Sequence, residues 1–130
     1  MLVIDASVAV AASYGADGFE EFGYEQLMAP ALLWSEARSA LHELLWRREI
    51  TRHDAEQARA RLETCPVERS RHRRLGDEAW RVADELGWAK TYDAEYIALA
   101  ALLGCRLVTL DARLRRATER LGFVVAPGEL

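Results

Sequence analysis

Short apolar runs alternate along the chain with longer segments in which apolar residues recur every three or four positions. Residues 2–4, 106–110 and 123–125 have the apolar and β-branched character of buried strands, and residues 67–68 resemble a shorter strand. The longer segments have the spacing of amphipathic helices, whose apolar side chains fall on one face. The pattern predicts strands and helices in alternation.

Local signals mark several ends of the predicted helices. Thr51, followed three residues later by Asp54, has the form of a capping start, whereas Gly87 and Gly104 are typical helix terminators. The stretch 13–23 contains three glycines and predicts only a short helix from residue 17 towards residue 27. The main helices are expected at residues 6–12, 31–48, 52–62, 73–86, 92–103 and 112–121.

This order of elements is typical of one fold class. Strands that alternate with helices form a mainly parallel sheet, because crossover helices must return the chain and cover both faces. We therefore predict an α/β/α sandwich. No repeat or linker divides the chain, so residues 1–130 are expected to form a single domain.

Composition adds the expected environment. The chain has 130 residues, 51% of them hydrophobic, which is enough for a core without disulfides or structural metal. Cys65 and Cys105 lack the spacing of a metal or redox motif and are expected to be buried, reduced thiols. No stretch approaches the roughly 20 apolar residues of a membrane span, and the charge at Asp5 interrupts any signal peptide. We expect a soluble, cytoplasmic protein without membrane association.

The charge is unevenly distributed. The net charge is −4, but nine of the sixteen arginines lie between Arg47 and Arg74. These arginines are interpreted either as ion-paired residues on solvated helix faces or as a basic face for nucleic acid. The sequence leaves both interpretations open.

Two carboxylates follow predicted strands. Asp5 comes directly after the strand at 2–4, and Asp111 comes after the strand at 106–110. Open α/β sheets bind ligands at the carboxyl ends of their strands, so both are candidate site residues. Aspartate between a strand and a helix is also a favoured N-cap, which is the structural alternative for each.

Two further acids lie on helices. Glu36 falls within or beside the apolar stripe of its helix, where burial of an unpaired charge would cost several kcal/mol. It therefore needs a cation, an arginine partner or a wet cleft. Asp93 shares a helix face with Tyr96 and Ile97, with helix capping as the alternative.

Four acids in one cleft favour a hard cation. Carboxylate oxygens suit Mg²⁺ or Mn²⁺, and Mg²⁺ promotes phosphodiester hydrolysis by polarising the phosphoryl group and activating water. The alternative metal site, zinc on His42, His53 and His72, lacks the spacing of known zinc motifs.

The motifs together resemble the PIN-domain ribonucleases, and among them the VapC-type toxins of bacterial toxin–antitoxin pairs. The resemblance spans nearly the whole chain. It depends on LVIDAS at 2–7, Pro30 with WSEA at 34–37, TYDAEYIALA at 91–100 and LVTLD at 107–111. It implies a PIN-like fold and a magnesium-dependent endoribonuclease, with Mn²⁺ as a substitute metal.

The resemblance also implies individual roles. Asp5 and Asp93 would be the principal metal ligands, and Glu36 and Asp111 would complete the catalytic pocket and orient the attacking water. The hydroxyls of Ser7 and Thr109 would support these groups, although both residues are also compatible with local capping or strand positions.

The chain departs from the family pattern in two places. Ser39 stands where many relatives carry Asn, and the stretch 13–23 is richer in glycine than usual. Arg113 could face a substrate phosphate but is more simply a solvated helix residue.

Partners are implied by the resemblance alone. They are a transfer or ribosomal RNA substrate, a VapB-type antitoxin whose peptide crosses the active site, and a second copy of the chain in a homodimer. Trp34, Trp46, Trp80 and Trp88 are candidates for either core or interface.

Two other functions are compatible with the sequence. One is a catalytically inactive PIN-fold module that binds RNA or protein. The other is a magnesium-dependent phosphatase with Asp5 as nucleophile, which is weakened because position 7 is Ser rather than a second Asp.

Overall fold

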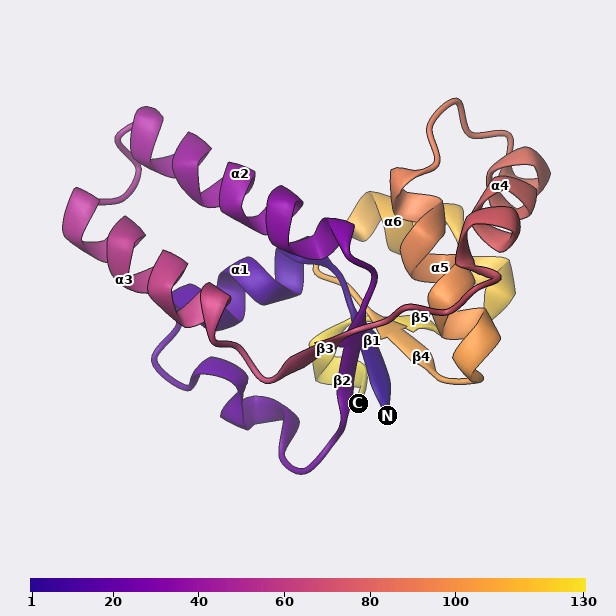
Figure 1. The fold of residues 1–130 in the computed structure, drawn as a ribbon, viewed down its shortest axis with the longest axis horizontal. Coiled ribbons are helices and arrows are strands. Elements are labelled where there is room, and N and C mark those ends of the chain that lie inside the picture. The colour runs from indigo at the N-terminus through magenta and orange to yellow at the C-terminus, as the bar shows by residue number, and fades with distance from the viewer.

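A five-stranded, wholly parallel sheet forms the centre of the molecule. The computed structural model describes residues 1–130, and its strand order is β3-β2-β1-β4-β5 (Figure 1). The predicted α/β class is confirmed, and the sheet is parallel at every pairing. The strands are β1 (Leu2–Ile4), β2 (Leu27–Ala29), β3 (Val67–Arg69), β4 (Arg106–Val108) and β5 (Val124–Val125).

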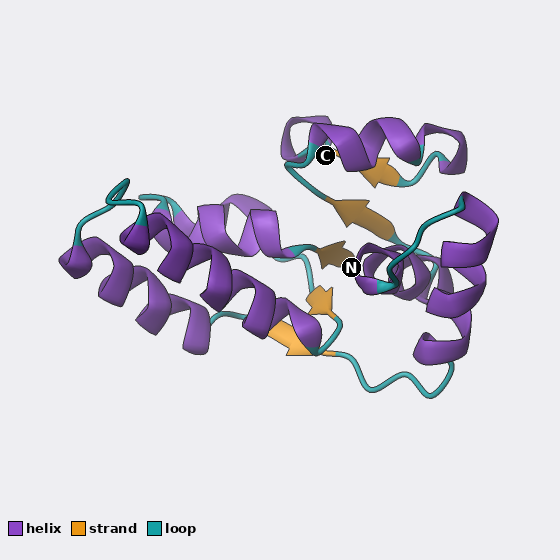
Figure 2. Cartoon of the chain, turned by 90° about the horizontal axis from the view of Figure 1, so that it is seen from above, coloured by secondary structure: helices purple, strands orange, loops and turns teal.

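Helices lie on both sides of the sheet (Figure 2). In Figure 1, α1, α2 and α3 gather on the left of the strands, and α4, α5 and α6 lie on the right. The predicted sandwich is therefore present. The helices are α1 (Ala6–Tyr14), α2 (Leu32–Trp46), α3 (Arg52–Glu63), α4 (Leu75–Leu86), α5 (Tyr92–Leu103) and α6 (Ala112–Ala117), with short 3₁₀ turns η1 (Gly18–Phe22), η2 (Glu119–Leu121) and η3 (Pro127–Glu129).

The predicted helix ends are confirmed where a local signal was strong. The Thr51 hydroxyl accepts a hydrogen bond of 3.1 Å from the backbone N–H of Asp54. Gly87 and Gly104 end α4 and α5 in the left-handed conformation, with φ of 71° and 65°. Side chains other than glycine adopt that conformation only with strain, which explains why both helices end there.

The stretch after α1 differs from the prediction. The expected helix from residue 17 towards residue 27 is wrong: a short 3₁₀ turn ends at Gly23, whose φ is 59°, and Leu27–Ala29 is a strand. The expected helix at 112–121 also changes to a 3₁₀ turn after Thr118. At Leu27–Ala29, the pairing with β1 and β3 overrides the local helical tendency.

The core surrounds β1, the central strand. Leu2, Val3 and Ile4 are all buried and belong to one cluster of 27 buried hydrophobic residues. Trp34 and Trp88 pack against this cluster, whereas Trp46 and Trp80 are 77% and 68% exposed. None of the helices has the length and apolar character needed to cross a bilayer.

The order of the strands reverses at β1. The chain moves outward from β1 through β2 to β3, then crosses to the other side for β4 and β5. In parallel sheets such a reversal leaves a crevice between the carboxyl ends of the two strands involved, which here are β1 and its neighbour β4. Asp5 and Asp111 follow these two strands.

Candidate active site

Asp5 lies at the carboxyl end of β1 and is only 6% exposed. Its carboxylate accepts hydrogen bonds from the Ser7 hydroxyl (2.5 Å), the backbone N–H of Val8 (3.1 Å) and the Thr109 hydroxyl. The bond from Val8 caps α1, so the capping interpretation of Asp5 is correct. A helix cap needs only the bond from Val8. The additional bonds from the Ser7 and Thr109 hydroxyls hold both oxygens of this buried carboxylate in place.

Ser7 and Thr109 connect the ends of β1 and β4. The Ser7 hydroxyl accepts a hydrogen bond of 3.0 Å from the N–H of Leu110, and the Thr109 hydroxyl accepts one of 3.0 Å from the N–H of Asp111. Each hydroxyl thus donates to Asp5 and accepts from the chain that follows β4. These bonds hold Asp5 and Asp111 at a set position relative to each other.

Asp111 is the N-cap of α6. Its Oδ1 accepts hydrogen bonds from the N–H groups of Arg113 (2.9 Å) and Leu114 (3.3 Å), so capping is confirmed here too. The second carboxylate oxygen makes no hydrogen bond within the chain. The nearest guanidinium, on the exposed side chain of Arg113, is 3.9 Å from Oδ1.

Glu36 projects from α2 and has intermediate burial. Its Oε1 accepts a hydrogen bond of 2.5 Å from the phenol of Tyr96 on α5. No ion pair of the molecule includes Glu36, so the alternative of an arginine partner is wrong. The carboxylate is held by a neutral donor and keeps its charge uncompensated.

Asp93 lies in the first turn of α5. The N-cap of this helix is Thr91, and Asp93 makes no capping bond, so the capping alternative is wrong. Asp93 lies three and four residues before Tyr96 and Ile97, so it is on their helix face, but at the end of that face nearer solvent, because these two are buried and Asp93 is exposed. Its carboxylate is therefore free to meet a ligand from solvent.

The four acids influence one another electrostatically. Burial is the main cause of the raised pKa of Asp5, and the charge of Asp111 raises it further despite the hydrogen bonds to its carboxylate. Burial likewise raises the pKa of Glu36, with added repulsion from Asp93 and Asp5. The pKa of Asp93 is raised by burial, then by Asp111 and Asp5, while Arg113 lowers it. The charge of Asp5 therefore acts on both Glu36 and Asp93, and the charge of Asp111 acts on Asp5 and Asp93.

Sequence reasoning missed two neighbours of Glu36. Tyr96 was expected only to share a helix face with Asp93, yet its phenol is the sole hydrogen-bond donor to Glu36. Glu95 is a fifth acid, and its pKa is raised by burial and then by the charge of Glu36. The available signal was Tyr96, three residues after Asp93, because this spacing places its phenol on the helix face of the candidate site.

The donor set fits a hard divalent cation. All four groups supply oxygen, and no basic side chain lies within 4.0 Å of Asp5, Glu36 or Asp93. No three acidic, histidine or cysteine side chains are arranged to ligate a single ion, which also excludes zinc on His42, His53 and His72 in this conformation. Mg²⁺ commonly uses one or two carboxylates and retains several waters, so the arrangement suits it.

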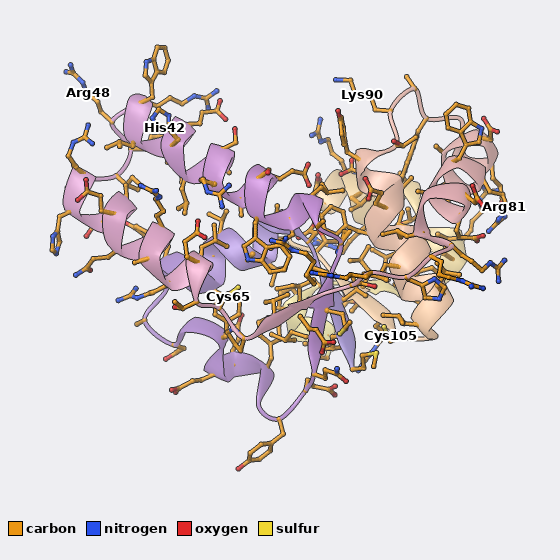
Figure 3. All side chains as sticks on the ribbon, in the orientation of Figure 1. His42, Arg48, Cys65, Arg81, Lys90 and Cys105 are labelled. Atoms are coloured by element: carbon orange, nitrogen blue, oxygen red, sulfur yellow. The ribbon has the colours of Figure 1, made fainter.

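The thiols take no part in this site. Cys65 and Cys105 are both free, as expected from their spacing, and lie in separate parts of the molecule (Figure 3). Burial raises the pKa of each thiol, which favours the unreactive protonated form.

The chain is similar in sequence to known proteins. The family profile of the PIN domain matches residues 2–120. A VapC ribonuclease of Mycobacterium bovis and ribonuclease VapC9 of Mycobacterium tuberculosis are each 35% identical to the chain over 115 residues, covering 88% of this chain and 88% of the relative.

Two solved structures have a similar fold. The crystal structure of PAE2754 from Pyrobaculum aerophilum has a TM-score of 0.74 and 26% identity, covering 98% of this chain and 90% of that one. A toxin–antitoxin complex from Klebsiella pneumoniae contains a chain with a TM-score of 0.69 and 17% identity, with 98% of each chain covered.

Proposed function

Because the chain belongs to the PIN-domain family and is related to VapC ribonucleases, we propose that it is a magnesium-dependent endoribonuclease. The observation that carries the proposal is a group of four carboxylates at the switch point of the sheet, in which Asp5 and Asp111 follow neighbouring strands and Asp5 lies close enough to Glu36 and Asp93 to raise the pKa of each. Four ionised carboxylates so close together repel one another unless a cation is bound between them. A hard cation next to a phosphodiester promotes hydrolysis of the phosphodiester.

We assign the principal ligand roles to Asp5 and Asp93. Asp5 is held in place by Ser7 and Thr109, and Asp93 faces solvent, where an ion and a phosphate enter. When bound, Mg²⁺ would polarise a phosphoryl oxygen and lower the pKa of a coordinated water. Asp111 keeps one oxygen without a partner in the chain, and this oxygen is available to a water at the edge of the pocket.

Glu36 has the properties of a proton acceptor in this scheme. A water that attacks phosphorus must lose a proton, and the acceptor works best when its pKa is closer to neutral than that of an ordinary carboxyl. Burial and neighbouring acids raise the pKa of Glu36 in that direction. The hydrogen bond from Tyr96 to Oε1 holds the carboxylate in place and leaves Oε2 available to accept a proton.

The phosphatase alternative is disfavoured by the surroundings of Asp5. A nucleophilic carboxylate must reach phosphorus, but Asp5 is 6% exposed and accepts three hydrogen bonds. These features suit a ligand of fixed position rather than an attacking group.

The experiment compares RNA cleavage in four samples. Total bacterial RNA is incubated with the wild-type protein in Mg²⁺, the wild type in EDTA, Asp93→Asn in Mg²⁺ and Asp84→Asn in Mg²⁺, and new RNA ends are mapped. Asp84 is an exposed residue of α4 and controls for the loss of one negative charge. Discrete ends are expected with the wild type and Asp84→Asn in Mg²⁺, and at least a roughly 100-fold loss with EDTA or Asp93→Asn.

The opposite result identifies the other candidate. A folded protein that binds RNA tightly but leaves every RNA intact would be a catalytically inactive binding module. Cleavage that persists in EDTA would refute the magnesium requirement while leaving the ribonuclease proposal in place.

The biological setting follows from the same relationship. We propose that the enzyme is the toxin of a toxin–antitoxin pair, that it acts on transfer or ribosomal RNA in the cytoplasm, and that a VapB-type antitoxin restrains it. We also propose a homodimer in which each copy is one domain over residues 1–130. Size-exclusion chromatography with light scattering, with and without the product of a neighbouring small gene, tests both assemblies.

A further inference from the structure

The connection between β3 and α4 carries an unusual concentration of positive charge. Residues 69–74 read Arg-Ser-Arg-His-Arg-Arg, and we call this segment the basic connection. Its four arginines, Arg69, Arg71, Arg73 and Arg74, are all exposed. They are four of the sixteen arginines of the chain. The basic connection is therefore strongly positive, although the net charge of the chain is −4.

None of these four arginines belongs to an ion pair of the molecule. Arginines on the helices behave differently: Arg47 pairs with Glu43 at 2.6 Å, and Arg81 pairs with Glu78 and Glu85. Arg74 influences the Glu78 carboxyl only from beyond 4.0 Å. Among the nine arginines from Arg47 to Arg74, the ion-pair interpretation therefore holds for Arg47 and for Arg52, which pairs with Glu56 at 3.9 Å, but not for the basic connection.

The basic connection begins at the same edge of the sheet as the acidic site. Ala29 is aligned with Arg69, and the N–H of Ser70 donates to the carbonyl of Ala29 at 2.8 Å. Continuing the register of the β1–β2 pair places Ser70 two strands away from Asp5. At the usual strand spacing, that separation is about 10 Å. A few nucleotides of RNA backbone can span such a distance.

The path and the anchoring of the segment favour an extended ligand. The basic connection crosses from the side of α1–α3 to the side of α4–α5 (Figures 1 and 2). The Arg69 guanidinium lies 4.7 Å from the ring centroid of Trp34, two residues before Glu36 on α2. The N–H of His72 donates to the Ser70 hydroxyl, and the N–H of Arg74 donates to Nδ1 of His72. These contacts order the backbone that carries the arginines.

We infer that the basic connection binds the phosphate backbone of the RNA substrate beside the scissile bond. The inference rests on the proposed function and extends it from the chemical step to substrate binding. The acidic site alone would repel a polyanion, whereas four guanidiniums without an ion pair, on a segment whose backbone begins about 10 Å from Asp5, supply the attraction that holds it. Because phosphates are the same in every nucleotide, this surface adds affinity without sequence preference.

The test measures RNA binding separately from cleavage. In an Asp93→Asn background, which keeps the RNA intact, Arg71, Arg73 and Arg74 are replaced together by Gln. The control replaces Arg47, Arg81 and Arg106 by Gln, which changes the net charge equally at exposed positions. Arg81 lies on the outer side of α4 (Figure 3), and Arg106 starts β4 at the opposite edge of the sheet. The probe is a fluorescein-labelled, mixed-sequence single-stranded RNA followed by anisotropy over a salt series.

Loss of three phosphate contacts should lower the slope of log affinity against log salt by about 2 and weaken binding about 100-fold at roughly 0.1 M salt. The control triple should retain affinity within about threefold, and replacing the same three arginines by Lys should restore most of the binding. Folding of each variant is checked by its thermal midpoint.

The outcomes separate the two proposals. Equal affinity and salt slope in the Gln triple and its parent would overturn the inference and leave the basic connection to an acidic protein partner. An equal loss in the control triple would also overturn it, because only total charge would then matter. A wild-type protein that cuts no RNA would refute the proposed function instead, whatever the binding results.

Discussion

The hydrogen bond between Tyr96 and Glu36 makes the sharpest prediction about the site. Tyr96 is 1% exposed, and its phenol reaches across from α5 to a carboxylate on α2 over 2.5 Å. Tyr96→Phe removes the only hydrogen bond to Glu36 and leaves the ring in place. The variant should therefore lose stability without creating a cavity, and Glu36 should become free to move.

The magnitude follows from the kind of bond. A hydrogen bond to a charged group contributes about 1.5–3 kcal/mol, and the partial exposure of Glu36 places this one near the lower end. For a chain of 130 residues the unfolding entropy is about 270 cal/mol/K, so a loss of about 1.5 kcal/mol lowers the thermal midpoint by about 5 °C. Tyr24→Phe is the matched control, because Tyr24 is fully exposed.

A double-mutant cycle measures the charged part of the interaction. Urea unfolding in EDTA is compared for the wild type, Tyr96→Phe, Glu36→Gln and the double variant. A charge-assisted bond is about twice as strong as a neutral one, so the coupling energy should be about 1 kcal/mol near pH 7.5. The Tyr96 bond favours the ionised carboxylate, so the coupling should fall as pH drops through the pKa of Glu36.

Two results would refute this reasoning. One is a coupling energy below about 0.3 kcal/mol, which is within the error of such cycles. The other is a coupling that stays constant down to about pH 4, since a neutral carboxyl would then be bound as strongly as a charged one. Cleavage offers a separate readout: kcat should fall about tenfold while KM stays nearly constant, because the bond positions Glu36 and does not contact substrate.

Three further predictions concern the acids and one helix cap. The pKa values of Asp5, Glu36 and Asp93 are raised in the folded state, so these groups stabilise the metal-free protein below about pH 4, and this stabilisation is lost as pH rises through the raised values. Urea midpoints measured in EDTA should therefore be lower at about pH 8 than at about pH 5. Addition of Mg²⁺ should reduce the difference. Asp93→Asn should raise the metal-free thermal midpoint by relieving repulsion while Asp84→Asn leaves it unchanged, and equal midpoints for the two variants would contradict the coupling of the acids. Thr51→Ala should cost about 1 kcal/mol in urea unfolding because it removes the side-chain cap of α3, and a loss under about 0.3 kcal/mol would show that water replaces the cap.

Local signals explain which elements could be predicted from the sequence. The uninterrupted apolar run at 2–4 predicted β1 to the residue, and the capping pair at Thr51 and Asp54 predicted the start of α3. The strand Leu27–Ala29 was missed because its first residue was assigned to the end of the helix expected from residue 17. It is a strand because β1 and β3 flank it and supply the hydrogen bonds.

The site shows the same division between local and long-range information. Asp5 and Asp111 could be placed from the strands that precede them, and the structure puts both at one edge of the sheet. The partner of Glu36 could not be placed, because Tyr96 is 60 residues away and its phenol belongs to an otherwise apolar helix face. The sequence also cannot show which acids lack an ion-pair partner, because this depends on which arginine or lysine side chains the fold brings close to them.

The reversal of strand order at β1 has a consequence for how the protein is made. Asp5 and Glu36 come from the first half of the chain, and Asp93 and Asp111 come from the second half, after the chain has crossed to the other side of β1. During synthesis, the nascent polypeptide displays half of these carboxylates until residue 93 has left the ribosome, and the fourth only when residue 111 has done so. A ribonuclease arranged in this way cannot complete its acidic site before almost the whole domain has been synthesised.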